Sequence, residues 1–252
     1  MDQKQKAEQF RALHVPGDPV VLFNIWDAGS AKAVAAAGAK ALATGSWSVA
    51  HAYGFEDGER MPLALAIENL RRIVSATDLP VTIDLESGYG DIGETIGLAI
   101  GAGAVGCNIE DSFPANGTLR EIDDQSDRIR RAREVADATG VRFFLNARTD
   151  VFFTAPREQH NDPMVDQAIE RARAYSSAGA DGLFAPGLVD VALIARLAKA
   201  SPLPLNIMAS DYTPSLDVLA ANGVARLSHG PRPYRLAMKA LEDAARAAFS
   251  AR

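Results

Sequence analysis

The chain has 252 residues, and its 26 Lys and Arg against 32 Asp and Glu give a formal net charge of −6. With 48% hydrophobic and 23% charged residues, the composition is that of a globular protein and excludes a disordered or fibrous chain. No stretch collects the basic face that a phosphate backbone requires, which argues against a nucleic-acid partner.

The elements predicted along the chain alternate between short apolar runs and longer segments of helical period, which is typical of βα units around a parallel sheet. After a polar N-terminal helix over about residues 3 to 14, we predict a helix after each of eight strands. These strands are Val20–Ile25, Ala41–Thr44, Val81–Asp84, Gly106–Glu110, Phe143–Arg148, Gly182–Phe184, Leu205–Met208 and Val224–Ser228.

Eight such units predict a (β/α)₈ barrel, and the length matches the roughly 250 residues of one complete barrel. We therefore predict a single domain over residues 1–252. An open doubly wound sheet is the alternative fold, but the segment after the first strand, Asn24–Ser30, lacks the glycine spacing of a dinucleotide-binding turn. The connection over residues 45–58 is longer than the usual 2–6 residues, which predicts a functional loop or a lid.

The cellular compartment is suggested by the single cysteine and by the N-terminal segment. One cysteine, Cys107, excludes an intramolecular disulfide framework and is compatible with a reducing compartment. The first ten residues are polar where a secretory signal needs an apolar run, and no run of about 18 apolar residues follows. We expect a cytoplasmic protein without a membrane partner.

Charged residues cluster at the predicted strand ends, where a barrel places its chemistry. The period-2 alternation of strands directs Asp84 and Glu86 toward the barrel axis, and the same parity directs Glu110 and Arg148 inward. Three carboxylates at one rim would repel each other unless a cation neutralised them, and Mg²⁺ prefers oxygen ligands. An ion-pair network balanced by Arg148 is the alternative. Asp57, in the long connection, could reach the same metal.

The segment that carries a family resemblance is residues 84–90, DLESGYG, which is similar to the D-x-D-T-G-[FY]-G motif of the isocitrate lyase/phosphoenolpyruvate mutase superfamily. Ile109–Asp111 and Ala147–Asp150 follow at spacings like those of the family. The resemblance covers nearly the whole chain. It implies a (β/α)₈ barrel that acts on a small 2-oxo or 2-hydroxy acid with Mg²⁺, or Mn²⁺ in its place.

The resemblance also implies a role for individual residues. Asp84 resembles the direct metal ligand, and Asp57, Glu86 and Glu110 resemble the residues that hold metal-bound waters. Catalytic roles would fall to Arg148, Glu110 and Asp57.

Substrate-binding roles are implied for a second set of residues. Arg148 resembles the residue that binds the substrate oxyanion or carboxylate, and the backbone N–H groups of Ser46 and Trp47 match a carboxylate cradle. Asn206 resembles an asparagine of the seventh strand. Family members commonly exchange their last helix between subunits, which implies a homo-oligomer, a dimer or more usually a tetramer, with Pro231–Ser250 as the exchanged segment.

Departures from the family pattern limit the reaction. The lyases' catalytic loop of the Lys-Lys-Cys-Gly-His type is absent, because residues 111–118 read DSFPANGT. Cys107 faces the helices and is expected to be a buried structural thiol.

The leading function is therefore a Mg²⁺-dependent carbon–carbon lyase that works through an enolate, including decarboxylation of an oxaloacetate-like substrate. One alternative is a phosphonopyruvate-type mutase or hydrolase that uses Asn116 of this loop. The other is a non-catalytic protein that binds 2-oxo acids.

Overall fold

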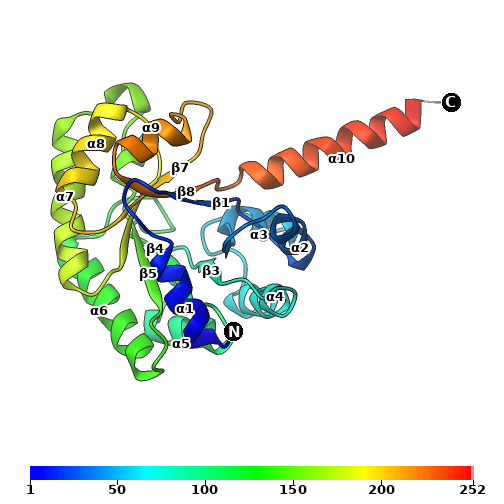
Figure 1. Ribbon diagram of the computed structural model, residues 1–252, viewed down its shortest axis with the longest axis horizontal. Coiled ribbons are helices and arrows are strands. Elements are labelled where there is room, and N and C mark those ends of the chain that lie inside the picture. Colours follow the sequence, from blue (N-terminus) through cyan, green and yellow to red (C-terminus); the bar gives the residue numbers. More distant parts are fainter. Residues whose placement is uncertain (251–252) are drawn as a thin grey trace.

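The computed structural model describes residues 1–250 and contains eight parallel strands with helices between them (Figure 1). The strands are β1 (Val20–Leu22), β2 (Leu42–Ala43), β3 (Val81–Asp84), β4 (Gly106–Glu110), β5 (Phe144–Arg148), β6 (Gly182–Ala185), β7 (Leu205–Met208) and β8 (Val224–Ser228). The helices are α1 (Gln3–Ala12), α2 (Ala28–Ala36), α3 (Ser46–Ala52), α4 (Leu63–Ser75), α5 (Ile92–Gly101), α6 (Ile122–Ala138), α7 (Asp162–Ser177), α8 (Val191–Ala200), α9 (Leu216–Ala221) and α10 (Arg232–Ser250), with 3₁₀ turns η1 (Val151–Phe153) and η2 (Arg157–Gln159).

The strand order β1-β8-β7-β6-β5-β4-β3-β2 is that of a barrel, and an isolated parallel bridge between Ile25 and Thr44 brings its two edges together. The Ile25 N–H donates to the Ala43 carbonyl at 2.9 Å, and the Gly45 N–H donates to the Ile25 carbonyl at 3.3 Å. The predicted (β/α)₈ fold is confirmed.

Most predicted strand bounds agree with the structure, and β3, β4, β7 and β8 begin and end at the expected residues. The predictions for β1 and the long connection were wrong in part. β1 ends at Leu22 because the next residues leave the ladder: the Asn24 side chain donates to the Thr44 carbonyl at 2.9 Å and accepts from the Gly230 N–H at 2.8 Å. The connection over residues 45–58 begins with a helix, α3, rather than being loop throughout.

Helix α1 covers the N-terminal end of the barrel. Phe10 is fully buried and its ring meets the ring of Phe144 edge-on at 5.5 Å. The Gln3 side chain donates to the carbonyls of Ile100 and Ala104, both at 2.8 Å. This end of the barrel is thus closed, which leaves the C-terminal strand ends as the place for a ligand.

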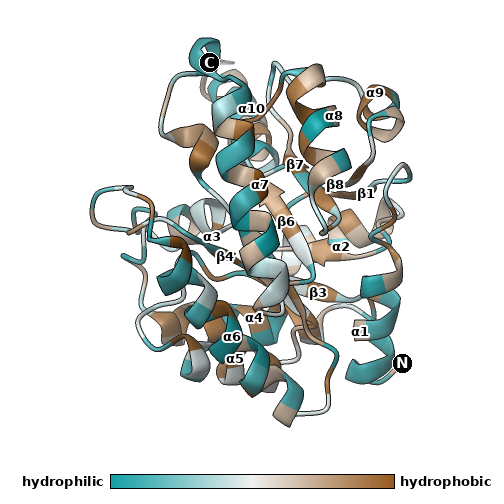
Figure 2. Cartoon of the chain, turned by 90° about the vertical axis from the view of Figure 1, so that its left-hand side faces the viewer, coloured by the Kyte–Doolittle hydropathy of each residue, from teal (hydrophilic) through white to brown (hydrophobic). Residues whose placement is uncertain are grey.

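Hydrophobic and polar residues are distributed as the barrel requires. The helices in Figure 2 are banded with hydrophilic and hydrophobic residues, because each has one solvated and one packed face. One large core cluster unites strands and helices, and it includes Cys107, whose thiol is fully buried. Burial raises the pKa of this thiol. The expectation of a structural cysteine is therefore supported.

Helix α10 extends away from the barrel, as Figure 1 shows. Only Pro233 of this helix is buried, whereas Leu241 and Phe249 expose 63% and 79% of their surface. Within residues 1–250, no helix is both long and apolar enough to span a membrane.

Candidate active site

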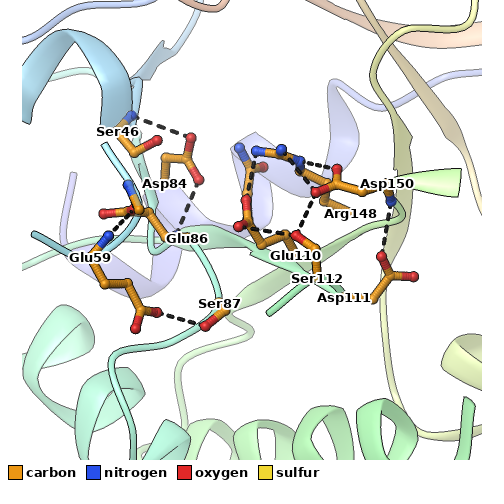
Figure 3. Close-up of polar contacts among 12 residues, drawn as sticks. Ser46, Glu59, Asp84, Glu86, Ser87, Glu110, Asp111, Ser112, Arg148 and Asp150 are labelled. Atoms are coloured by element: carbon orange, nitrogen blue, oxygen red, sulfur yellow. Dashed lines mark hydrogen bonds and ion pairs between the residues drawn. The ribbon is translucent and has the colours of Figure 1, made fainter. Parts of the chain in front are cut away.

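The polar residues at the C-terminal strand ends form two groups (Figure 3). One group lies around β3 and the connection after β2, and the other lies around β4 and β5. The labelled members are Ser46, Glu59, Asp84, Glu86 and Ser87 in the first group and Glu110, Asp111, Ser112, Arg148 and Asp150 in the second.

Asp84 is the last residue of β3 and is held by β2. Its N–H donates to the Thr44 hydroxyl at 3.0 Å, and its carboxylate accepts from the Ser46 N–H at a long 3.3 Å. Asp57 lines the same cavity as Asp84, and loss of hydration and the nearby charge of Asp84 raise the pKa of Asp57. Neither carboxylate forms an ion pair within the described residues, so both oxygen pairs are available to a cation.

Arg148 ends β5 and pairs with two carboxylates. Its Nη1 lies 2.7 Å from Glu110, and its Nε and Nη2 donate to Asp150 at 2.6 and 3.1 Å. These two acids raise the pKa of Arg148 and keep it charged, despite burial that acts in the opposite sense. The Ser112 hydroxyl donates to Asp150 at 2.6 Å. Glu110 therefore forms an ion pair with Arg148, as the alternative interpretation of the sequence predicted.

Glu86 does not point toward Arg148, because the chain turns sharply after β3 and Glu86 has φ +51°. Its carboxylate accepts from the N–H groups of Gly58 and Glu59 at 2.7 and 2.5 Å and from the Tyr89 hydroxyl at 2.5 Å. The prediction that Glu86 points toward the barrel axis was therefore wrong, because the alternation of side chains holds only within the strand and β3 ends at Asp84. Glu86 stands where the family motif has its second aspartate. The additional methylene of glutamate lets the carboxylate reach the connection that carries Asp57.

Glu59 makes the reciprocal contact, from the connection after β2 back to the turn after β3. This residue was not identified from the sequence. Its carboxylate accepts from the Ser87 hydroxyl at 2.7 Å and from the Tyr89 N–H at 2.8 Å. Glu59, Glu86 and Tyr89 are the non-glycine residues with positive φ in residues 1–250. Such backbone persists only where its surroundings hold it in place. We call these reciprocal contacts the Glu59–Glu86 clamp, which fixes the end of the connection next to Asp57.

The pH dependence of stability provides a test of the clamp. Burial raises the pKa of Glu86 from 4.5 to about 7. Between these values the folded protein keeps a proton that the unfolded chain has lost, so its contribution to stability is present below pH 4.5 and is lost as pH rises through about 7. We expect Glu86→Gln, which keeps the shape, to remove this loss. The loss amounts to at most about 3.5 kcal/mol, because the pKa rises from 4.5 to about 7 and each unit of pKa corresponds to about 1.4 kcal/mol.

The measurement is urea unfolding of metal-free wild type and variant at pH 5 and pH 8. Glu68→Gln, on the exposed face of α4, is the control and should follow wild type. Parallel stability profiles for wild type and Glu86→Gln would contradict the assignment.

The cavity between the two groups has a volume of about 160 Å³. It brings together five of the residues predicted from the sequence, namely Ser46, Trp47, Asp57, Asp84 and Arg148. We call it the catalytic cavity. Glu110 contacts it through Arg148, and Glu86 lies in a small adjoining space that Asp84 also lines.

Two predicted substrate residues lie outside the catalytic cavity. Asn206 is buried within the barrel, where its carbonyl oxygen accepts from the Ser228 hydroxyl at 3.2 Å. Asn116 is exposed in the loop after β4, and its side chain accepts from the N–H and hydroxyl of Thr118 at 3.0 and 2.8 Å. In this conformation Asn116 stabilises a turn instead of facing the cavity.

Arg226 lies beneath the cavity, inside β8, and is fully buried. It forms no ion pair within residues 1–250; its Nε donates to the Ser228 hydroxyl at 3.0 Å, and an Nη donates to Asn108 at 3.4 Å. Burial lowers its pKa to about 9, and the charge of Asp84 opposes the shift. It remains a cation near neutral pH and adds positive potential below the site.

The residues around Asp84 fit a hard divalent cation. Among residues 1–250, no three Asp, Glu, His or Cys side chains converge closely enough to hold a metal by themselves. Mg²⁺ does not need such a set, because it is often bound by one or two carboxylates and keeps several waters. Asp84 and Asp57 are two unpaired carboxylates on one cavity, which is a suitable donor set.

Comparison with known proteins identifies the family. A sequence profile described as phosphoenolpyruvate phosphomutase matches residues 10–249. The chain belongs to the isocitrate lyase/phosphoenolpyruvate mutase superfamily. It is therefore an enzyme of that superfamily, and the non-catalytic alternative is set aside.

Two relatives illustrate its place within the superfamily. An uncharacterised protein of Mycobacterium tuberculosis H37Rv is 34% identical over 94% of this chain and 88% of the relative. The 2-methylisocitrate lyase of Escherichia coli K12 is 29% identical over 96% of this chain and 84% of the lyase.

Solved structures share the barrel. A crystal structure from Burkholderia cenocepacia J2315, provisionally described as a phosphonomutase, superposes with a TM-score of 0.96 at 58% identity, over 98% of this chain and 99% of that one. A phosphonopyruvate hydrolase in complex with oxalate and Mg²⁺ has a TM-score of 0.82 at 22% identity, over 96% of this chain and 85% of that one. The latter likeness is one of fold alone.

Proposed function

We propose that the protein is a Mg²⁺-dependent lyase that acts on a small 2-oxo or 2-hydroxy acid through an enolate. The observation that carries this proposal is the pair of unpaired carboxylates, Asp57 and Asp84, facing Arg148 across one cavity of about 160 Å³. Carboxylates on one side suit a metal, and a guanidinium on the other suits the negative charge of the substrate.

Arg148 provides the fixed donors of the reaction. An enolate places negative charge on the oxygen at C2, and a preorganised donor stabilises that charge without reorganising as it forms. Glu110 and Asp150 hold the guanidinium from behind and leave two of its N–H groups for a ligand. Mg²⁺, when bound at Asp84, would supply Lewis acidity toward the same oxygen.

The N-terminal N–H groups of α3, at Ser46 and Trp47, are available to bind a substrate carboxylate. Both residues line the catalytic cavity, and the bond from the Ser46 N–H to Asp84 is long. Mg²⁺ as the cofactor is supported by the donor chemistry and by the phosphonopyruvate hydrolase complex, which holds the metal with oxalate.

Cleavage of a C–P bond is the second candidate, and it is favoured by the 58% identical structure described provisionally as a phosphonomutase. The same binding groups would serve, because phosphonopyruvate also forms an enolate at C2. Asn116 would then have to turn inward from the position that it occupies beside Thr118.

Three substrates distinguish these reactions. We expect oxaloacetate or phosphonopyruvate to exceed methylisocitrate in kcat/KM by at least about 10²-fold, because a positioned general acid contributes 10²–10⁴-fold and the lyase loop cysteine is absent. The measurement is turnover with saturating Mg²⁺, with pyruvate, phosphate and phosphoenolpyruvate assayed separately, because a mutase would form phosphoenolpyruvate and release no phosphate. A methylisocitrate value of about 10⁴ M⁻¹s⁻¹ or more would contradict the prediction.

We also propose that α10 packs on another copy of the chain. An apolar groove of about 570 Å³ lies between β1 and α2, and it is lined by Val21 and Phe23, each more than a third exposed. Helix α10 presents a complementary apolar face with Leu241 and Phe249, and little in its own barrel covers that face. Exchange of α10 between subunits would bury both surfaces, in agreement with the oligomer expected from the resemblance.

Substitutions on the two faces of α10 test this assembly. We expect Leu241→Gln with Phe249→Gln to shift the protein to monomers in sedimentation experiments, because burial of these side chains contributes about 1.5–3 kcal/mol each. Lys239→Gln with Arg246→Gln, on the charged face, is the matched control and should leave the mass unchanged. A monomeric wild type would contradict the proposal.

A further inference from the structure

A second cavity adjoins the catalytic cavity and has no role in the proposed reaction. It has a volume of about 360 Å³ and lies among the loops that follow β5, β6 and β7. Phe153 and Met208 line both cavities and therefore form their common wall. We call the second space the tail cavity. Arg148 lines the catalytic cavity beside this wall, so the wall separates its guanidinium from the tail cavity.

The common wall is built on two glycines. Gly187 has φ +87°, and a Cβ at that position would lie 3.0 Å from the ring of Phe153. Gly230 has φ +54°, and a Cβ there would lie 3.0 Å from the Met208 sulfur. Phe153 and Met208 thus occupy the space that a side chain at these two glycine positions would need. Phe153 is also tied to the site, because the Arg148 guanidinium lies 5.7 Å from its ring centre.

The charges around the tail cavity cancel. Arg157 pairs with Glu158 at 2.7 Å and stacks on the Tyr212 ring at 3.6 Å. Its guanidinium is thereby occupied, so it offers little to the second carboxylate of a dicarboxylate. Val189 and the two wall residues make most of the remaining lining apolar, and the one other polar side chain, Ser210, is already engaged by Thr213 and by the Tyr212 N–H. The chemistry of this cavity suits an uncharged hydrocarbon group.

We propose that the tail cavity binds an alkyl extension of the substrate, so that the enzyme prefers 2-oxo or 2-hydroxy acids that carry a chain of about four carbons. The proposal rests on the proposed function for the position of the acid group at Arg148. The tail cavity is more than twice as large as the catalytic cavity, about 360 against 160 Å³. The tail cavity therefore has room for a chain of this length.

Oxamate and N-butyloxamate, unreactive analogues of a 2-oxo acid, test this proposal in calorimetry with saturating Mg²⁺. Each buried methylene contributes about fourfold in affinity, so we expect N-butyloxamate, with its four carbons buried, to bind about 250-fold more tightly than oxamate. Val189→Trp should fill the cavity and abolish this gain while the affinity for oxamate is unchanged. Val191→Trp, on the exposed start of α8, is the matched control and should keep the gain.

The outcomes separate the two proposals. Equal affinities for the two probes, with oxamate bound, would overturn the tail cavity alone. A gain that survives both Val189→Trp and a second blocking variant, Ser210→Phe, would place the butyl group elsewhere and also overturn it. Failure of oxamate itself to bind wild type with Mg²⁺ would refute the proposed function together with this inference.

Discussion

The Asp84→Asn variant is expected to lose Mg²⁺ binding and nearly all activity while the barrel stays folded. Asp84 ends β3 beside Asp57, and neither carboxylate has a cationic partner in the described residues. Asparagine keeps the side-chain size but removes the charge that a hard cation requires. Because the enolate would lose its metal, we expect kcat/KM to fall by at least about 10²–10³-fold.

Calorimetric titration with Mg²⁺ measures the first effect and steady-state turnover the second. Asp78→Asn is the matched control, since Asp78 is exposed just before the opposite end of the same strand. Circular dichroism should show both variants folded. Unchanged Mg²⁺ affinity in Asp84→Asn would reject Asp84 as the metal ligand.

The Arg148→Lys variant is expected to lose about 10²-fold in kcat/KM although the charge is retained. Arg148 uses three N–H groups on Glu110 and Asp150 and keeps two others for the cavity, which a lysine ammonium with three donors cannot reproduce. The effect should appear in kcat more than in KM, because the lost donor acts on charge that develops in the transition state.

The control for this change is Arg142→Lys, an exposed position just before the opposite end of β5 that pairs with Glu8 at 3.2 Å. It should leave both constants unchanged. Near-normal kinetics in Arg148→Lys would make Arg148 a structural counter-charge to the two acids, and the site would then need another oxyanion donor.

The sequence by itself determined the barrel, its strands and the direction of the side chains within them. Each buried parallel strand is a short apolar run bounded by turn residues, so β3 and β4 could be predicted to the residue. Alternation within a strand is a local property of extended backbone. For that reason the positions of Asp84 and Arg148 on one cavity followed from their places in β3 and β5.

Only the tertiary structure decided what lies beyond the strand ends. Glu86 follows β3 in a left-handed backbone conformation, and its contacts with Gly58 and Glu59 join segments 27 and 28 residues apart. The sequence left open whether Glu110 pairs with Arg148, and that pairing, the depth of Asn206 and the outward turn of Asn116 depend on neighbouring strands and loops. Side chains alternate along a strand whatever packs against it, so their directions can be predicted locally. The conformation of a loop depends on the segments that pack against it, and these cannot be predicted from the local sequence.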